Sequence, residues 1–231
     1  MSDDSFIREV DEELRSEQVQ QVWQRYGKLI VGGAIAIVLA VGAYRYYHYY
    51  TAQQAATAGD AFMSAVELAE SGKVDEALAA LETIEKESTP AYQALAGMRR
   101  AAELAKQGKS TDAIAVYDAI AGNNAIEQNL RAIARLRGGL LTVDVGSVSD
   151  VLSRVTPLLG PGAVYRNSAK EALALAHYKA DELEKAAKLY AEIRNDSETP
   201  RALGGRATLM LELIASQGGP AVPPATPGTA N

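Results

Sequence analysis

The best chemical motif in this sequence is a fragment of a phosphate-binding loop. The stretch "GKST" at residues 108–111 resembles the end of such a loop, whose lysine and hydroxyl group hold a nucleotide phosphate and its magnesium ion. That pattern also requires a glycine five residues before Gly108, where this chain has Glu103. The stretch joins two expected helices and follows no strand, so we interpret it as a turn.

The other titratable residues are not grouped as catalytic or metal sites require. The chain has no cysteine, which excludes thiolate catalysis and thiolate metal ligands. Its two histidines, His48 and His177, lie in unrelated segments, and the common hydrolase, metalloprotease and dinucleotide motifs are missing. The acidic pair Asp181 and Glu182 stands at the start of an expected helix, where carboxylates interact favourably with the dipole. We therefore expect no enzyme, no cofactor, no metal ion and no small-molecule substrate.

Protein binding is the remaining class of function. A net charge of −6 and a pI near 5.1 argue against nucleic acid as the partner, because phosphate binding requires a basic surface. Arg99 and Arg137 occupy equivalent positions on two expected helices, from which they could donate hydrogen bonds to the backbone or carboxylates of a bound protein. The alternative is that each arginine is solvated or paired within its own chain.

Residues 29–44 form an apolar run of 16 residues, between the lengths typical of a core helix and of a membrane span. Aromatic and basic residues flank both ends, as in the interfacial belts of membrane helices. Together with these flanking residues the run is long enough to cross a bilayer, and we predict a transmembrane helix over residues 28–50. A cleaved signal peptide is excluded, because the 28 residues before the run include seven acids. The residues that we expect to anchor this span are Trp23, Tyr26, Lys28, Gly32, Ala36, Ala40, Arg45, Tyr46 and Tyr47.

Small residues recur every four positions within the span, at Gly32, Ala36 and Ala40. Such a stripe permits close helix contact, although it is equally typical of ordinary membrane helices. Four basic residues precede the apolar run, whereas only Arg45 follows it before Lys73. This bias predicts a cytoplasmic N-terminus and an exported C-terminal part, which in a bacterium means the inner membrane and the periplasm.

One helical sequence pattern recurs four times between residues 71 and 193, in the part of the chain expected to be exported. The copies are "SGKVDEALAALETI" (71–84), "QGKSTDAIAVYDAI" (107–120), "VGSVSDVLSRVTPLL" (145–159) and "KADELEKAAKLYAEI" (179–193). A small or apolar residue recurs at spacings of 36, 38 and 35, with larger apolar residues four and seven positions later on the same helical face. The residues at the small position are Ala77, Ala113, Val151 and Ala186.

Each copy follows another helix with apolar periodicity, and turn residues separate the pairs. A period of two helices near 35 residues is similar to a tetratricopeptide repeat, although the consensus Trp and Gly-Tyr of the first helix are missing. The alternative is a helical bundle without solenoid geometry. We therefore expect an all-α protein in which a single N-terminal transmembrane helix precedes a tetratricopeptide-repeat-like solenoid. The expected division is a cytoplasmic tail (1–27), the span (28–50), a linker (51–58), the repeat domain (59–217) and a disordered Pro/Ala-rich tail (218–231).

The order of these parts resembles the YfgM-like family of ancillary SecYEG translocon subunits. The resemblance is carried by Trp23, the Tyr26-Gly27-Lys28 entry to the Gly/Ala-rich span, Arg45-Tyr46, the glutamines 53 and 54, and the first "GKVDEAL" helix pair. It implies an inner-membrane anchor, a periplasmic repeat domain, and partners among the SecYEG translocon, periplasmic chaperones and exported proteins. It implies no catalytic residue. A repeat scaffold for another envelope assembly, such as cell division, is the second hypothesis.

Overall fold

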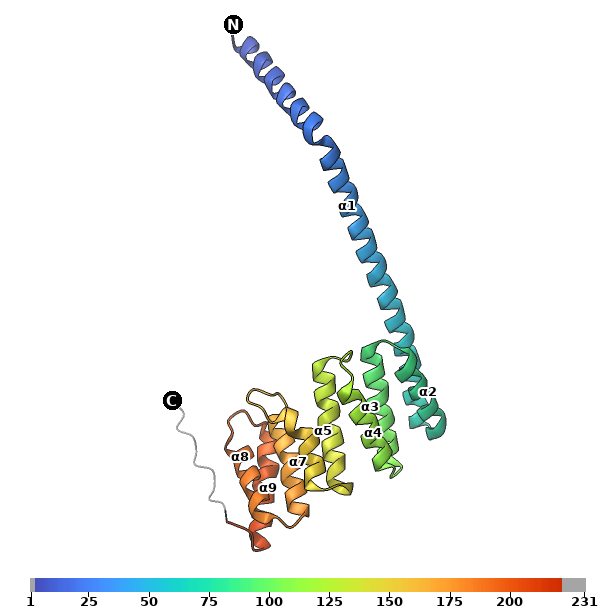
Figure 1. Cartoon of the computed structure of the whole chain (residues 1–231), viewed down its shortest axis with the longest axis vertical. Helices are drawn as coiled ribbons and strands as arrows, with labels where there is room; N and C mark the ends of the chain where they lie inside the picture. The colour runs from blue at the N-terminus through green and yellow to red at the C-terminus, as the bar shows by residue number, and fades with distance from the viewer. Residues whose placement is uncertain (1–2, 222–231) are drawn as a thin grey trace. The chain divides into compact units, whose positions relative to one another are not determined.

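The computed structural model describes residues 3–221, with side chains from residue 23 onward except those of residues 24 and 30. The described residues form α-helices and one short 3-10 helix, with no strand among them, so the predicted all-α fold is confirmed (Figure 1). The chain divides into two compact units, Met1–Gln54 and Ala55–Asn231. The C-terminal part of the predicted tail, residues 222–231, lies outside the described residues.

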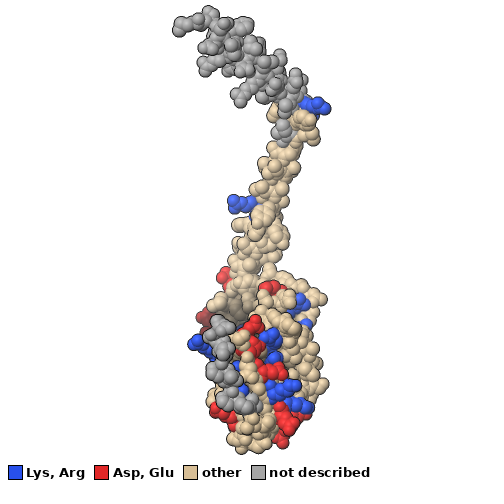
Figure 2. All heavy atoms as spheres, turned by 90° about the vertical axis from the view of Figure 1, so that its left-hand side faces the viewer, with Lys and Arg blue, Asp and Glu red and all other residues tan. Residues whose placement is uncertain are grey.

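The N-terminal unit belongs to one long helix, α1 (Asp3–Glu70). Its described part contains a segment long and apolar enough to cross a membrane, of which almost nothing is buried. Figure 2 shows this segment as an uncharged stretch with a basic side chain at each end. A helix of a soluble core would bury such side chains, and this one exposes large residues such as Leu29, Leu39 and Tyr46.

Residues 51–58, which the sequence analysis assigns to a linker, are helical and belong to α1. The segment "TAQQAATA" is rich in the good helix formers Ala and Gln and contains no Gly or Pro to interrupt the helix. The boundary between the two units falls inside this segment, after Gln54. The segment between the apolar run and the repeat domain is therefore helical.

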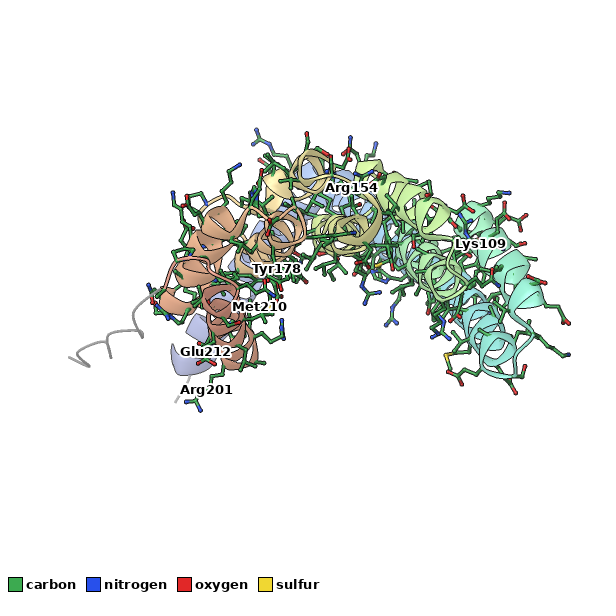
Figure 3. The ribbon with its side chains drawn as sticks, turned by 90° about the horizontal axis from the view of Figure 1, so that it is seen from below. Lys109, Arg154, Tyr178, Arg201, Met210 and Glu212 are labelled. Atoms are coloured by element: carbon green, nitrogen blue, oxygen red, sulfur yellow. The ribbon has the colours of Figure 1, made fainter. Side chains whose placement is uncertain are left out.

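The C-terminal unit stacks helix pairs. The end of α1 pairs with α2 (Val74–Glu87), α3 (Pro90–Lys106) with α4 (Ser110–Gly122), α5 (Gln128–Val145) with α6 (Val148–Val155), and α7 (Arg166–Lys179) with α8 (Leu183–Asn195). A 3-10 turn, Thr156–Leu158, follows α6, and α9 (Arg201–Ser216) comes last. Each helix from α2 onward packs against the next, and α5 also contacts α3 and α7. Seen along the helices, this unit is an arch with α3, α5, α7 and α9 on its inner side (Figure 3).

The repeated small positions lie where neighbouring helices approach each other. Ala77, Ala113, Val151 and Ala186 are all fully buried. The larger residues four positions later are buried too, and each such side chain contributes about 1.5–3 kcal/mol through its removal from water. The repeat register inferred from the sequence is therefore the packing register of the domain.

Three turns within the pairs have a residue in the left-handed conformation at the same position. Gly72 and Gly108 have φ values of 85° and 76°, and Asp181 occupies the equivalent position with a φ of 60°. In each turn the next residue donates its N–H to a carbonyl five residues back, as Lys109 does to Leu104 over 2.9 Å. The α5–α6 turn differs: there Gly146 is extended, and Ser147 caps α6 through its hydroxyl and the Asp150 carboxylate.

The junction between α8 and α9 is fixed by a polar cluster. Arg166 donates to Asp196 over 2.6 Å, and the buried Asn167 donates to both Asp196 and Thr199. The backbone N–H of Glu198, followed by Asn167 and Arg166, lowers the pKa of Asp196 below its usual value. The cluster stabilises the chain direction that places α9 on the preceding pair.

Replacing Gly108 by alanine should lower the free energy of unfolding by about 1–2 kcal/mol, because a side chain is strained in the left-handed conformation. Asp181→Gly should have the opposite sign and raise it by up to about 1 kcal/mol. Thermal unfolding of the full-length chain in detergent, followed by circular dichroism, measures both. Gly122→Ala is the control, because Gly122 has no positive φ and open space at its Cβ. If Gly108→Ala were as harmless as this control, the turn account would be wrong.

Candidate protein-binding surface

Two of the helices on the inner side of the arch, α3 and α5, carry a matching set of side chains. We call this set the inner stripe: Leu95, Arg99 and Ala102 on α3, and Ile133, Arg137 and Leu140 on α5. Residues spaced by four and then three positions share one face of a helix, and the α5 set follows the α3 set by 38 residues throughout. The buried face of α3, which includes Met98, Ala101 and Leu104, packs into the core with α4. Within the stripe Leu95, Arg137 and Leu140 are exposed, whereas the other three residues are half-buried and Ile133 packs against the core.

Large apolar side chains reach solvent on this stripe. Leu95 is 39% exposed and Leu140 is 36% exposed. Tyr178 of α7 and Met210 of α9, which Figure 3 labels on the inner side of the arch, are partly buried against the core of that end of the domain. Exposed leucines on a curved surface are typical of surfaces that bind proteins.

Arg99 is committed to its own helix. Its Nη2 lies 3.0 Å from Oε1 of Glu103, and the Nζ of Lys106 lies 2.9 Å from the same oxygen. Glu103 is only 4% exposed. A buried carboxylate is costly unless it is paired, so Arg99 and Lys106 neutralise it from two sides. For this arginine, the alternative of pairing within the chain holds.

Arg137 has no such partner. Its side chain is exposed, and no hydrogen bond or ion pair links it to another residue in the described part of the chain. The equivalent of Glu103 one repeat later is Leu141, which removes the acid that would hold Arg137. The two arginines that the sequence treats alike therefore have different roles, and Arg137 is the one whose donors face solvent.

Ion pairs elsewhere in the repeat domain connect neighbouring helices. Arg100 binds Glu85 across α3 and α2 at 2.7 Å, and Arg154 binds Asp118 across α6 and α4 at 2.8 Å. Lys179 donates to the backbone carbonyl of Val143 at the end of α5. Many basic side chains of the described repeat domain are therefore engaged within the domain and are not free for a partner.

The residues predicted to anchor the span lie along the exposed part of α1. Trp23, Tyr26, Tyr46 and Tyr47 are exposed, and the guanidinium of Arg25 lies 5.8 Å from the ring centroid of Tyr26. The other members, Lys28, Gly32, Ala36, Ala40 and Arg45, are exposed as well. Their role in a membrane remains a prediction.

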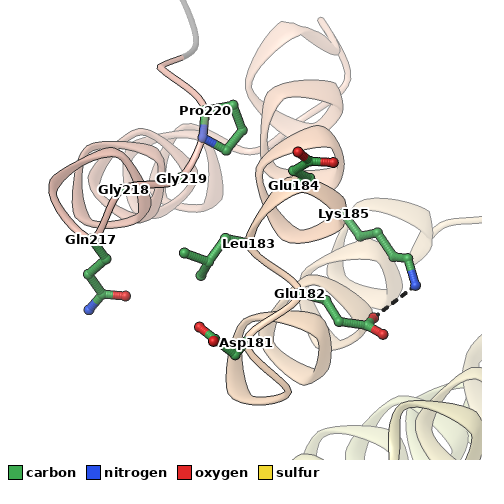
Figure 4. Close-up of a pocket in the computed structure, with 9 residues that line it drawn as sticks. All are labelled: Asp181, Glu182, Leu183, Glu184, Lys185, Gln217, Gly218, Gly219 and Pro220. Atoms are coloured by element: carbon green, nitrogen blue, oxygen red, sulfur yellow. Dashed lines mark ion pairs between the residues drawn. The ribbon is translucent and has the colours of Figure 1, made fainter.

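The described residues contain no group of acids and histidines that could hold a metal ion. A pocket of about 650 Å³ lies between the α7–α8 turn and the end of α9, lined by residues such as Glu182, Lys185 and Gln217 (Figure 4). Hydrogen bonds from His177 and then Lys185 lower the pKa of Glu182, so this carboxylate is held in its charged form. The carboxylate is thus paired with neighbouring cations, and the inner stripe remains the stronger candidate site.

Sequence reasoning found Arg99 and Arg137 but missed the leucines beside them. Leu95 lies four residues before Arg99, and Leu140 lies three residues after Arg137. The available signal was the 38-residue repeat, in which Leu95 is equivalent to Ile133 and Leu140 to Ala102. What the sequence could not provide is exposure, because apolar residues at helical spacing are usually buried.

Comparison with known proteins gives the family. A family model described as "Tetratricopeptide repeat-like domain" matches residues 20–172. The match covers well over half of the chain, so the protein belongs to this family. No curated protein and no solved structure matches the chain.

The different roles of the two arginines should appear in stability. Arg99→Ala should lower the free energy of unfolding by about 1–3 kcal/mol, because it removes a charged partner from the buried Glu103. Arg137→Ala should change it by less than about 0.5 kcal/mol, as expected for an exposed side chain without a partner. Urea unfolding of the full-length chain compares the two. Equal losses would contradict the assignment of Arg137 as a free donor.

Proposed function

We propose that this chain is an inner-membrane-anchored protein-binding module whose periplasmic repeat domain holds exported proteins beside the SecYEG translocon and links them to periplasmic chaperones. The observation that carries the proposal is the inner stripe, an exposed apolar surface with an unpaired arginine on a tetratricopeptide repeat-like domain. Stacked helix pairs present such a curved surface to extended or helical segments of other proteins.

The apolar segment of α1 supports a location at a membrane. It is long enough to cross a bilayer, it exposes its side chains, and basic residues cluster on its N-terminal side. We infer that the N-terminus is cytoplasmic and that the repeat domain is periplasmic. A domain held at the membrane meets other membrane proteins at a high effective concentration, so that weak contacts are sufficient.

The inner stripe suits the class of client that a translocon releases. Proteins that emerge unfolded expose apolar residues and free backbone groups, which leucine side chains and an arginine can bind together. Broad rather than sequence-specific binding follows, because the stripe offers one free charge and several apolar side chains. This matches the role of a module that transiently holds many exported proteins.

Purification at native expression level tests the proposal. The full-length chain, extracted in mild detergent, should recover SecY, SecE or SecG, and replacing residues 29–44 by an unrelated span should abolish that recovery. The double variant Arg137→Glu, Leu140→Glu should keep the translocon components and lower the yield of exported proteins about tenfold, because it places charge on the apolar stripe. Lys188→Glu, at an exposed position on α8, is the matched control.

Recovery of cell-division or other envelope proteins without any translocon component would overturn the proposal and favour the scaffold hypothesis. An unchanged yield of exported proteins from the double variant would remove the inner stripe as the binding surface.

A further inference from the structure

The last helix, α9, exposes an apolar stripe that no described helix covers. One face of α9 packs against α7 and α8 through Leu203, Ala207, Leu211 and Ile214. On the opposite face Leu209 is 65% exposed, although leucines elsewhere in the repeats are mostly buried. The remaining residues of this open face, all of them exposed, are Arg201, Ala202, Gly205, Glu212, Leu213 and Ser216.

The repeat pattern explains why the face is open. In three earlier repeats the first helix ends at a left-handed residue and the second helix follows after a short turn. The end of α9 has the same geometry: Gly218 has a φ of 88°, and Gly219 donates its N–H to the carbonyl of Ile214 over 3.0 Å. The sequence then continues with "PAVPPATPG", in which four of nine residues are proline, a residue that is unfavourable in a helix interior. The described chain therefore ends its stack on an uncovered first helix.

We propose that a second copy of this chain covers the open face, through antiparallel pairing of the two α9 helices about a two-fold axis. A two-fold interface must be self-complementary, because the same patch faces itself. In an antiparallel pair related by a two-fold axis, one edge of a helix lies beside the same edge of the other helix, and the two chains run in opposite directions. Residues on one edge, at equal distances on either side of the axis, therefore contact each other.

The charges on the open face fit this symmetry. Arg201 and Glu212 are 11 residues apart, about three turns, so they lie on the same edge of α9. Antiparallel pairing brings Arg201 of each copy next to Glu212 of the other, which gives two ion pairs. Both side chains are exposed, and neither has an ion pair with another described residue (Figure 3).

The sizes of the apolar residues fit the same register. Gly205 and Leu209 occupy the centre of the face, and a Cβ added at Gly205 would meet no atom within 4 Å. Leu209 of one copy therefore has room against Gly205 of the other. Ala202 and Leu213 form a second small and large pair on the other edge. The pairs 201/212, 205/209 and 202/213 each have their midpoint within half a residue of position 207. A single two-fold axis near that position therefore brings all three pairs into contact.

Cysteine cross-linking in intact cells tests the register, because the natural chain has no cysteine. Two differently tagged full-length chains, Ala202→Cys and Leu213→Cys, should form a mixed disulfide dimer when they are produced together. Each variant produced alone should give little cross-linked dimer, because like positions lie several turns apart in the antiparallel pair. Strong cross-linking of either variant with itself, or none in the mixture, would overturn the proposal.

Charge reversal tests the ion pairs with a rescue. Co-purification of two differently tagged full-length chains should fall about tenfold for Arg201→Glu and for Glu212→Arg, because each places like charges opposite one another. The double variant should restore it. Lys188→Glu and Glu87→Arg, exposed on α8 and α2, are the matched controls. A single variant without effect, or a double variant without rescue, would contradict the pairing. In the cysteine experiment, cross-linking of α9 to a different protein would also contradict it.

Discussion

Close approach of neighbouring helices at one small buried position in each pair is the constraint on which the repeat domain depends. Ala77, Ala113, Val151 and Ala186 let the helices come together, and the larger residues beside them fill the remaining space. A helix pair that buries only one of its apolar faces needs the next pair to cover the other. The last described helix, α9, has no described helix on its outer face. The short connections fix the direction of growth, and the arch follows from that repeated step.

Two surfaces are left over by this packing. The inner helices keep leucines and Arg137 in solvent because no helix of the described chain crosses the arch. The end of the stack keeps Leu209 in solvent because α9 is the last helix of the described residues. Many basic residues of the described repeat domain are held by ion pairs or hydrogen bonds within the domain, such as Arg100 with Glu85, which leaves few free charges to recognise a partner. Apolar area with sparse charge favours weak and broad binding, and the membrane anchor that we propose makes weak binding sufficient.

The sequence predicted the elements that depend on periodicity. The repeat register, the glycine turns and the long apolar helix follow from spacings of small, large and turn residues, and all are found. The sequence did not predict features that depend on contacts with a neighbouring side chain. Arg99 is held by Glu103 whereas Arg137 is free, because one buried acid is replaced by Leu141 in the next repeat. The conformation of the segment expected as a linker was not predicted; it is helical because its local helix propensity is high and no Gly or Pro interrupts it. Asp181 in a glycine position could be found only by alignment with Gly72 and Gly108.

The most direct measurement is site-specific photo-cross-linking in living cells. A photoreactive amino acid at Leu140, on the inner stripe, is compared with one at Lys188, exposed on α8 of the outer layer. If the repeat domain holds exported proteins on its inner side, the probe at position 140 should capture many of them during export, and the probe at position 188 should capture few. Equal capture at both positions, or none at position 140, would contradict the account.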